Sequence, residues 1–143
     1  MNGSLVLIIV PLLLAIIPAL QEKVPLDTGF TILLLERSEY PPGIEAEIQT
    51  TSTYPCAGFR VQSEIIWYLD TVTIALGGLV RPSPCFSGME RATGNIYLGN
   101  LGKGTFILRV RYRGHEDLHL LHKTKAGIEM KPRIDAFTTV NTK

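Results

Sequence analysis

Apolar and polar side chains alternate with a period of two over much of this chain. In residues 44–50 the apolar positions are Ile44, Ala46 and Ile48, with polar residues between them. Residues 105–113 alternate in the same way, with one apolar face and one arginine-bearing face. Successive side chains of a β-strand point to opposite faces of a sheet, so this pattern predicts two half-buried strands.

Residues 59–69 repeat the alternation and contain the only tryptophan, Trp67. The pattern places Trp67 on the apolar face, and we expect it to pack in the core near the cysteines. A further strand is predicted at residues 72–76. The Gly77-Gly78 pair that follows predicts a bend or a β-bulge, because glycine tolerates the backbone conformations that such features require.

The whole chain divides into short strands separated by Gly- and Pro-rich turns. Residues 81–94 are predicted to form a loop with a helical turn at 89–92, and residues 133–143 an edge strand or a frayed tail. The remaining strands are predicted at residues 28–36, 95–98, 118–123 and 128–130. Seven or eight strands without a long amphipathic helix indicate an all-β, antiparallel, immunoglobulin-like β-sandwich.

One strand also carries a resemblance. Residues 104–110, Gly-Thr-Phe-Ile-Leu-Arg-Val, resemble a strand found in secreted immunoglobulin-like and prealbumin-like sandwiches. This resemblance covers a small part of the chain and implies a fold class. No functional residues are carried over from it.

The first 20 residues differ from the rest in composition. Residues 5–20 are all Leu, Val, Ile, Ala or Pro. This run is shorter than the roughly 20 residues of a membrane span and fits a secretory signal, with Ala19 the best residue before a cleavage point. A cleaved signal, a retained membrane anchor and a buried core helix all remain open. We expect residues 21–143 to form one domain, with its core in residues 28–131.

The two cysteines, Cys56 and Cys85, predict a disulfide bond. Such a bond would close the ends of the hairpin between them and stabilise the fold by about 3–4 kcal/mol in the chain-entropy treatment. Together with the leader, it indicates a secreted, periplasmic or extracellular protein that stays membrane-tethered if the leader is retained. A reduced, buried pair in a reducing compartment is the alternative.

Charge is nearly balanced, with 14 Lys and Arg against 13 Asp and Glu. We therefore expect no nucleic-acid partner, and membrane contact only through residues 5–20 if they are uncleaved. The stripe of Arg109, Arg111 and Arg113 is a candidate surface for an acidic glycan, a phosphate surface or an acidic protein. The alternative is a solvated strand face that is balanced by carboxylates on neighbouring strands.

The histidines form the second candidate. His115, His119 and His122 would share one face of a helix and could bind zinc or copper there. On a strand, which the surrounding pattern favours, only His115 and His119 share a face. The alternatives are a metal site and a set of exposed strand and turn histidines.

Catalytic patterns are missing from the sequence. Residues 99–104 are glycine-rich but lack the Gly-Lys-Ser/Thr ending of a phosphate-binding loop, and no serine lies in a Gly-x-Ser-x-Gly pattern. We therefore expect no enzyme and no cofactor. The sequence favours an exported, non-catalytic module for binding, adhesion or envelope association, with an unknown protein or glycan partner. A small metal-binding protein that uses the His115–His122 region is the alternative.

Overall fold

The computed structural model describes residues 28–143, which form nine strands; the predicted leader or anchor at residues 1–20 lies outside them. No helix in this described part is long and apolar enough to cross a membrane. The strands are β1 (Phe30–Arg37), β2 (Gly43–Ala57), β3 (Arg60–Tyr68), β4 (Thr71–Val80), β5 (Phe86–Gly99), β6 (Gly104–Tyr112), β7 (His115–Thr124), β8 (Gly127–Ile134) and β9 (Thr138–Thr142).

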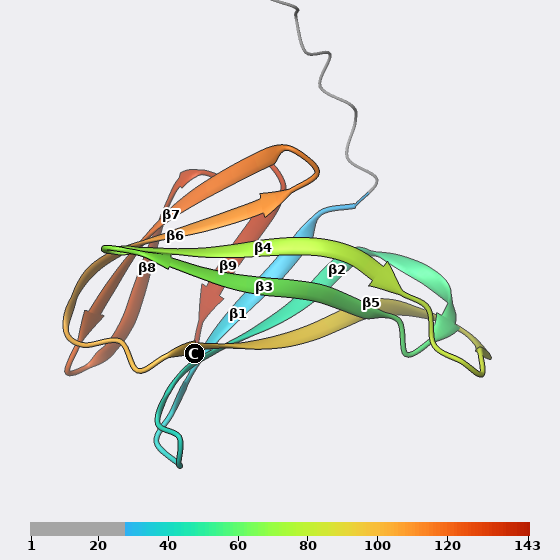
Figure 1. Cartoon of the computed structure of the whole chain (residues 1–143), viewed down its shortest axis with the longest axis horizontal. Helices are drawn as coiled ribbons and strands as arrows, with labels where there is room; N and C mark the ends of the chain where they lie inside the picture. Colours follow the sequence, from blue (N-terminus) through green and yellow to red (C-terminus); the bar gives the residue numbers. More distant parts are fainter. Residues whose placement is uncertain (1–27) are drawn as a thin grey trace, which may run out of the picture.

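All nine strands belong to one sheet with the order β8-β7-β6-β4-β3-β5-β2-β1-β9. The sheet curls until its two edge strands, β8 and β9, approach each other in a nearly closed barrel (Figure 1). The all-β prediction is confirmed. The two-layered, immunoglobulin-like sandwich is not, because parallel pairings of β4 with β6 and of β3 with β5 join all nine strands in one sheet where a sandwich would have two.

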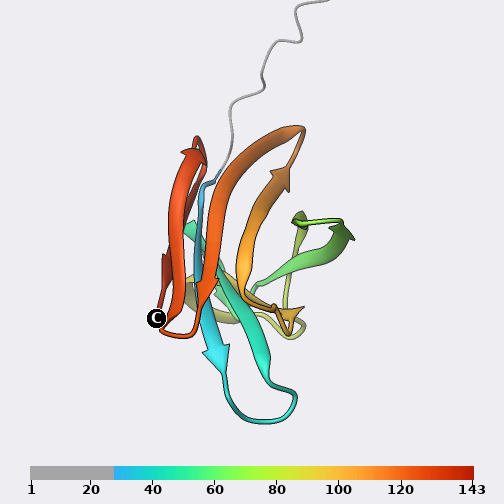
Figure 2. The same ribbon diagram turned by 90° about the vertical axis from the view of Figure 1, so that its left-hand side faces the viewer.

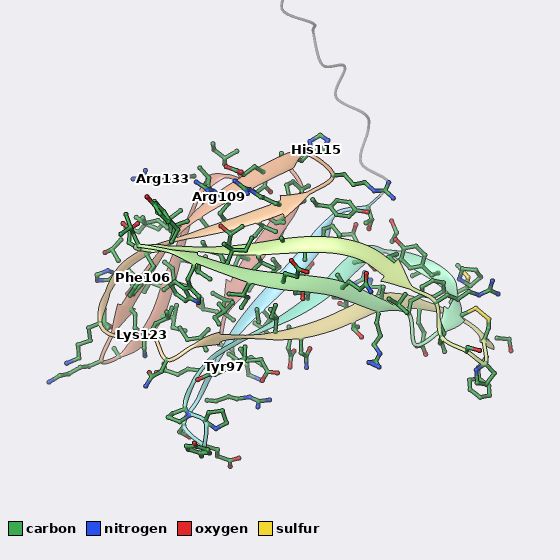
Figure 3. The ribbon with its side chains drawn as sticks, in the orientation of Figure 1. Tyr97, Phe106, Arg109, His115, Lys123 and Arg133 are labelled. Atoms are coloured by element: carbon green, nitrogen blue, oxygen red, sulfur yellow. A yellow bond between two sulfur atoms is a disulfide. The ribbon has the colours of Figure 1, made fainter. Side chains whose placement is uncertain are left out.

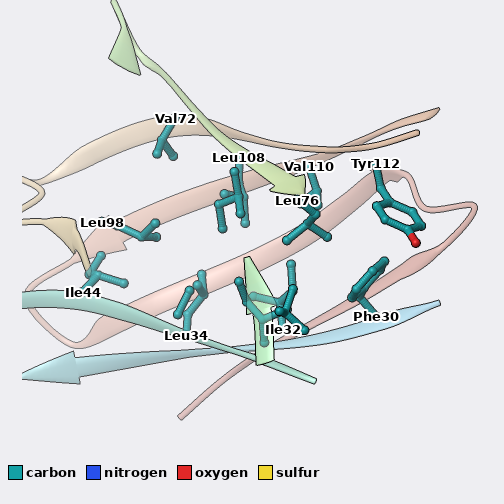
Figure 4. Packing of buried hydrophobic residues seen from close by; sticks show 14 of the residues in the cluster. Phe30, Ile32, Leu34, Ile44, Val72, Leu76, Leu98, Leu108, Val110 and Tyr112 are labelled. Atoms are coloured by element: carbon teal, nitrogen blue, oxygen red, sulfur yellow. The ribbon is translucent and has the colours of Figure 1, made fainter. Parts of the chain in front are cut away.

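The core fills the inside of this curled sheet. Phe30, Ile32 and Leu34 of β1 point toward Leu108 and Val110 of β6, and all five are buried (Figure 4). These residues occupy alternate positions along their strands, so one face of each strand is removed from water. The period-two predictions for residues 44–50 and 105–113 are therefore confirmed.

Strand β5 is the largest departure from the predicted elements. Residues 81–94 were expected to form a loop with a helical turn at 89–92, whereas β5 begins at Phe86 and pairs with β2. The first half of β5 is exposed on both faces, so its sequence carries no apolar alternation. Gly94 lets β5 approach β3, since a Cβ atom there would lie 2.7 Å from the carbonyl oxygen of Val61.

The glycine pair in β4 forms the predicted bulge. Val61 pairs with Leu79 and Ser63 pairs with Leu76, so Gly77 and Gly78 together lie opposite a single residue of β3. The bulge bends the β3–β4 hairpin. Figure 2 shows this hairpin, in green, standing away from β7, β8 and β9 on the other side of the molecule.

The disulfide bond between Cys56 and Cys85 is present, with a Cα–Cα distance of 5.3 Å. It encloses the β3–β4 hairpin in a covalent loop, as expected. The ladder beside it is that of β2 and β5, where Cys56 pairs with Ser87. The bridge therefore fastens the ends of two neighbouring strands, and it is consistent with an oxidising environment.

Candidate functional site

One carboxylate on the next strand pairs with two residues of the arginine stripe. Arg109 Nε lies 3.2 Å from Glu116 Oε1, and Arg111 Nε donates a 2.8 Å hydrogen bond to Glu116 Oε2. Arg113 lies over the ring of Tyr112, 5.3 Å from its centroid. Glu116 thus offsets part of the positive charge on this face, and a polyanionic partner for the stripe stays a prediction.

The histidines occupy β7 with the alternation expected of a strand. His119 is buried and His122 is exposed on the opposite face, so the three rings do not converge. His119 Nε2 lies 2.8 Å from Thr138 Oγ1. Within residues 28–143, no three His, Cys, Asp or Glu side chains form a group that could hold a metal ion.

His119 belongs to a buried network that is centred on Asp117. This fully buried carboxylate accepts hydrogen bonds of 2.7–2.9 Å from the segment that leads into β9. The donors are the backbone N–H groups of Ala136, Phe137 and Thr138 and the Thr138 hydroxyl. Because β9 is the last strand of the curled sheet, Asp117 fastens the closure of the fold.

The same network determines the tautomer and the protonation of the His119 ring. The Thr138 hydroxyl donates to Asp117 Oδ2, so it accepts from His119 Nε2–H, and the neutral ring is protonated at Nε2. Burial lowers the pKa of His119 below its usual value, against the opposing effect of the Asp117 and Asp135 carboxylates. These contacts explain the histidine and the carboxylate as structural groups.

A different surface stands out at the tip of the β3–β4 hairpin. Four consecutive large apolar residues are exposed there: Ile66 (49%), Trp67 (42%), Tyr68 (73%) and Leu69 (84%). We call these residues the apolar tip. The prediction that Trp67 packs in the core is wrong, because β3 runs past the end of the core and carries the ring to its rim.

The apolar tip is held firmly by β6. The carbonyl oxygen of Asp70 accepts a 2.9 Å hydrogen bond from the backbone N–H of Ile107. The Trp67 ring meets the Phe106 ring edge to face, with 6.5 Å between their centroids. Figure 3 shows Phe106 at the end of the molecule where the hairpin turns. These two contacts position the tip against β6.

Leu69 takes an unusual backbone conformation in the two-residue turn between β3 and β4. Its φ is 52°, in the left-handed region that favours glycine, asparagine or aspartate. A bulky residue there costs on the order of 1–2 kcal/mol. A strained residue that holds an apolar side chain in water is a reason to examine the tip for function.

Strand β3 also has a free edge. It pairs with β4 along its whole length, but with β5 only through Arg60 and Thr93. Beyond that pair the two strands diverge (Figure 1). Residues 63–68 consequently pair with no strand on this side within the described part of the chain.

The pairing pattern tells which backbone groups face this free edge. The two-residue turn makes Tyr68 and Thr71 a hydrogen-bonded pair, so the even-numbered residues of β3 bond to β4. Consistently, the carbonyl of Phe59 bonds to β5 on the other side. The N–H and C=O groups of Ser63, Ile65 and Trp67 therefore point outward.

The two terminal strands of the sheet, β8 and β9, differ from the edge of β3. Strand β8 carries Lys131-Pro132-Arg133 just before its last residue, Ile134, and Pro and Lys residues discourage pairing with another chain. Strand β9 has only five residues. Within residues 28–143, β3 combines a free edge with exposed large apolar side chains and carries no proline or lysine.

A surface depression lies beside this strand. It has a volume of about 500 Å³ and is lined by residues 62–64 of β3 and 75–77 of β4. Glu64 is the only ionisable residue in its lining, so the depression holds no pair of groups for acid–base catalysis.

The sequence did contain a signal for the apolar tip. In residues 65–69 the apolar side chains continue through the outward positions Ile66 and Tyr68, where a half-buried strand normally has polar residues. The free edge had no such signal, because strand neighbours depend on the topology of the whole sheet. No protein-family model, curated protein or solved structure matches this chain.

Proposed function

We propose that the chain is an exported, non-catalytic binding module that captures an extended, apolar segment of a protein partner along the free edge of β3. The observation that carries the proposal is the coincidence of this edge with the apolar tip. Residues 63–68 offer unpaired backbone groups, and residues 66–69 offer exposed apolar surface directly beside them.

Strand addition explains both features together. A partner strand laid along β3 would bond to the outward N–H and C=O groups of Ser63, Ile65 and Trp67, which supplies affinity with little dependence on sequence. Ile66 and Tyr68 would contact its side chains on one face of the sheet, and Ile65 and Trp67 on the other. Specificity for apolar side chains would follow from those contacts.

Export is supported by two separate observations. The disulfide bond between Cys56 and Cys85 suits an oxidising compartment. The apolar residues 5–20 suit a signal or an anchor. Residue 28 joins the sheet beside Thr51, whereas the β3–β4 turn lies at the other end of the strands. A chain anchored through its N-terminus would thus present the apolar tip away from its anchor.

Site-specific photo-crosslinking in the native host tests the proposal. A photoreactive residue replaces Tyr68 in the full chain, and the control replaces Phe86, an aromatic residue of similar exposure at the disulfide end. We expect a discrete adduct at position 68 and none at position 86. Equal labelling at both positions, or no adduct at 68, would argue against the tip as a binding surface.

A second pair of variants tests the role of the backbone. Ile65→Pro removes an N–H that faces the free edge, while Ile65→Ala shortens the side chain and keeps that N–H. Proline is tolerated on a strand edge that donates no ladder hydrogen bond, so both variants should fold. We expect the adduct at position 68 to be lost with Ile65→Pro and retained with Ile65→Ala.

A further inference from the structure

We infer that the segment captured by β3 is the same strand of a second copy of this chain, in an antiparallel, two-fold symmetric pair. This inference rests on the proposed function and names the partner for that site. A two-fold interface must be complementary to itself, since each surface meets its own copy. The free part of β3 meets this requirement in its backbone, its side chains and its charges.

The backbone fits a two-fold axis that passes through Ile66. In an antiparallel pair centred there, Ile66 faces Ile66 of the second copy, and Ile65 faces Trp67 of the second copy. Ile65 and Trp67 are the residues whose N–H and C=O groups point to the free edge. They therefore form hydrogen-bonded pairs on both sides of the axis, with about four ladder bonds in total.

The side chains are self-complementary in this register. In the segment 64–68, Ile66 lies at the axis, and the large apolar residues Ile65 and Trp67 lie on either side of it. The aliphatic Ile65 meets the aromatic Trp67 of the second copy on one face. Aromatic and β-branched residues are favourable neighbours across strands.

Charge favours the same register. Centring the pair on Ile66 places Glu64 opposite Tyr68 of the second copy, so that no like charges face each other. Centring it on Glu64 would place two carboxylates directly opposite, which is unfavourable. A register centred on Ile66 also keeps the second copy clear of Arg60, where β5 already occupies the edge.

The exposed area of the apolar tip suits a small, reversible pair. From the exposed fractions of its four residues, the apolar tip offers roughly 500 Å² per copy, given that a large aromatic side chain buries 150–250 Å². Two copies together would bury at most about 1,000 Å² through these residues, which is the size of a weak, reversible interface. Phe106, which already contacts Trp67, would add to this area.

Sedimentation equilibrium of the purified full chain, from about 1 µM to several hundred µM, tests the inference. The wild type should form dimers as its concentration rises. Ile66→Lys and Ile66→Glu should each weaken the dimer by roughly 100-fold, as expected for the centre of a small interface. The matched control, Val80→Lys, introduces the same charge at a residue of similar exposure on β4 and should dimerise like the wild type.

Mixing the two variants gives the sharpest test. Position 66 faces itself across the axis, so Ile66→Lys and Ile66→Glu should form a heterodimer that neither forms alone. This recovery also shows that both variants are folded. A wild type that stays monomeric, a dimer that Ile66→Lys leaves intact, or a mixture without recovery would each overturn the inference.

The crosslink at position 68 separates this inference from the proposed function. An adduct with twice the mass of the chain supports the second copy as the partner. An adduct with a different protein, together with a monomeric wild type, overturns the second copy and leaves capture by β3 in place. If no adduct forms and the wild type is monomeric, both proposals fail.

Discussion

Replacing Asp117 with alanine should cause the largest loss of stability among the polar substitutions in this protein. The carboxylate accepts hydrogen bonds from three backbone N–H groups and from the Thr138 hydroxyl, and it is fully buried. A buried donor without a partner costs about 1–3 kcal/mol, and partial relaxation reduces the sum, so we expect a loss of about 3–5 kcal/mol. For a domain of this size, the Tm should fall by about 10–20 °C.

Urea unfolding followed by circular dichroism measures this loss, with Glu116→Ala as the matched control. Glu116 is the adjacent carboxylate, but it is partly exposed and pairs with Arg109 and Arg111 at the surface. Its removal should cost no more than about 1 kcal/mol. A loss below about 1 kcal/mol for Asp117→Ala, or equal losses for the two variants, would refute the role of Asp117 in fastening β9.

Four further expectations follow from the structure. Reduction of the Cys56–Cys85 bridge should lower the free energy of unfolding by about 3–4 kcal/mol in urea, and an unchanged midpoint would contradict its structural role. The lowered pKa of His119 means that, as the pH falls below about 6.5, the unfolded chain binds a proton before the folded chain does. The contribution of His119 to the free energy of unfolding should therefore be complete above pH 6.5 and decline toward pH 5 by at most about 1.4 kcal/mol per pH unit. In parallel pH titrations, His119→Gln should not show this decline. Leu69→Gly should relieve the strain of the left-handed backbone and raise the free energy of unfolding by about 0.5–1 kcal/mol. It should also weaken partner capture. A lower free energy of unfolding would contradict the strain. Zinc or copper titration should leave the Tm within about 1 °C, since the His119 ring already bonds to Thr138, whereas a larger rise that His119→Gln abolishes would revive the metal hypothesis.

Strand positions could be predicted from the sequence wherever one face of the strand is buried and the other is exposed to solvent. This condition holds for residues 44–50 and 105–113, whose alternation gave the correct strands and the correct inward faces. It fails at the start of β5, which is exposed on both faces. Apolar and polar residues alternate because one face of a strand is buried, so a strand with neither face buried shows no such alternation.

Sheet topology could not be predicted in the same way. The pairings of β4 with β6 and of β3 with β5 join strands that are not consecutive in the sequence, and these pairings distinguish one curled sheet from two layers. The free edge of β3 is a consequence of that order. Local sequence specifies strands and turns, whereas the neighbours of a strand depend on how the whole core is filled.

The candidate residues illustrate the same limit. The sequence predicts His119 as a candidate metal ligand, yet its ring donates to Thr138, which lies in a segment predicted only as an edge strand or a frayed tail. Nothing in the sequence around Asp117 indicates the hydrogen bonds that it accepts. Its actual partners, Ala136 to Thr138, are brought to it by closure of the sheet.

Amide hydrogen exchange along β3 tests the central claim most directly. In dilute full-length protein, the N–H groups of Ile65 and Trp67 should exchange rapidly, because they face the free edge. Those of Glu64 and Ile66 should be protected, because they bond to β4. When the partner binds, or when the concentration rises if the partner is a second copy, protection of Ile65 and Trp67 should increase at least about 10-fold while that of Glu64 and Ile66 stays unchanged. Equal protection of all four amides in dilute protein, or no change on binding, would contradict capture by the edge of β3.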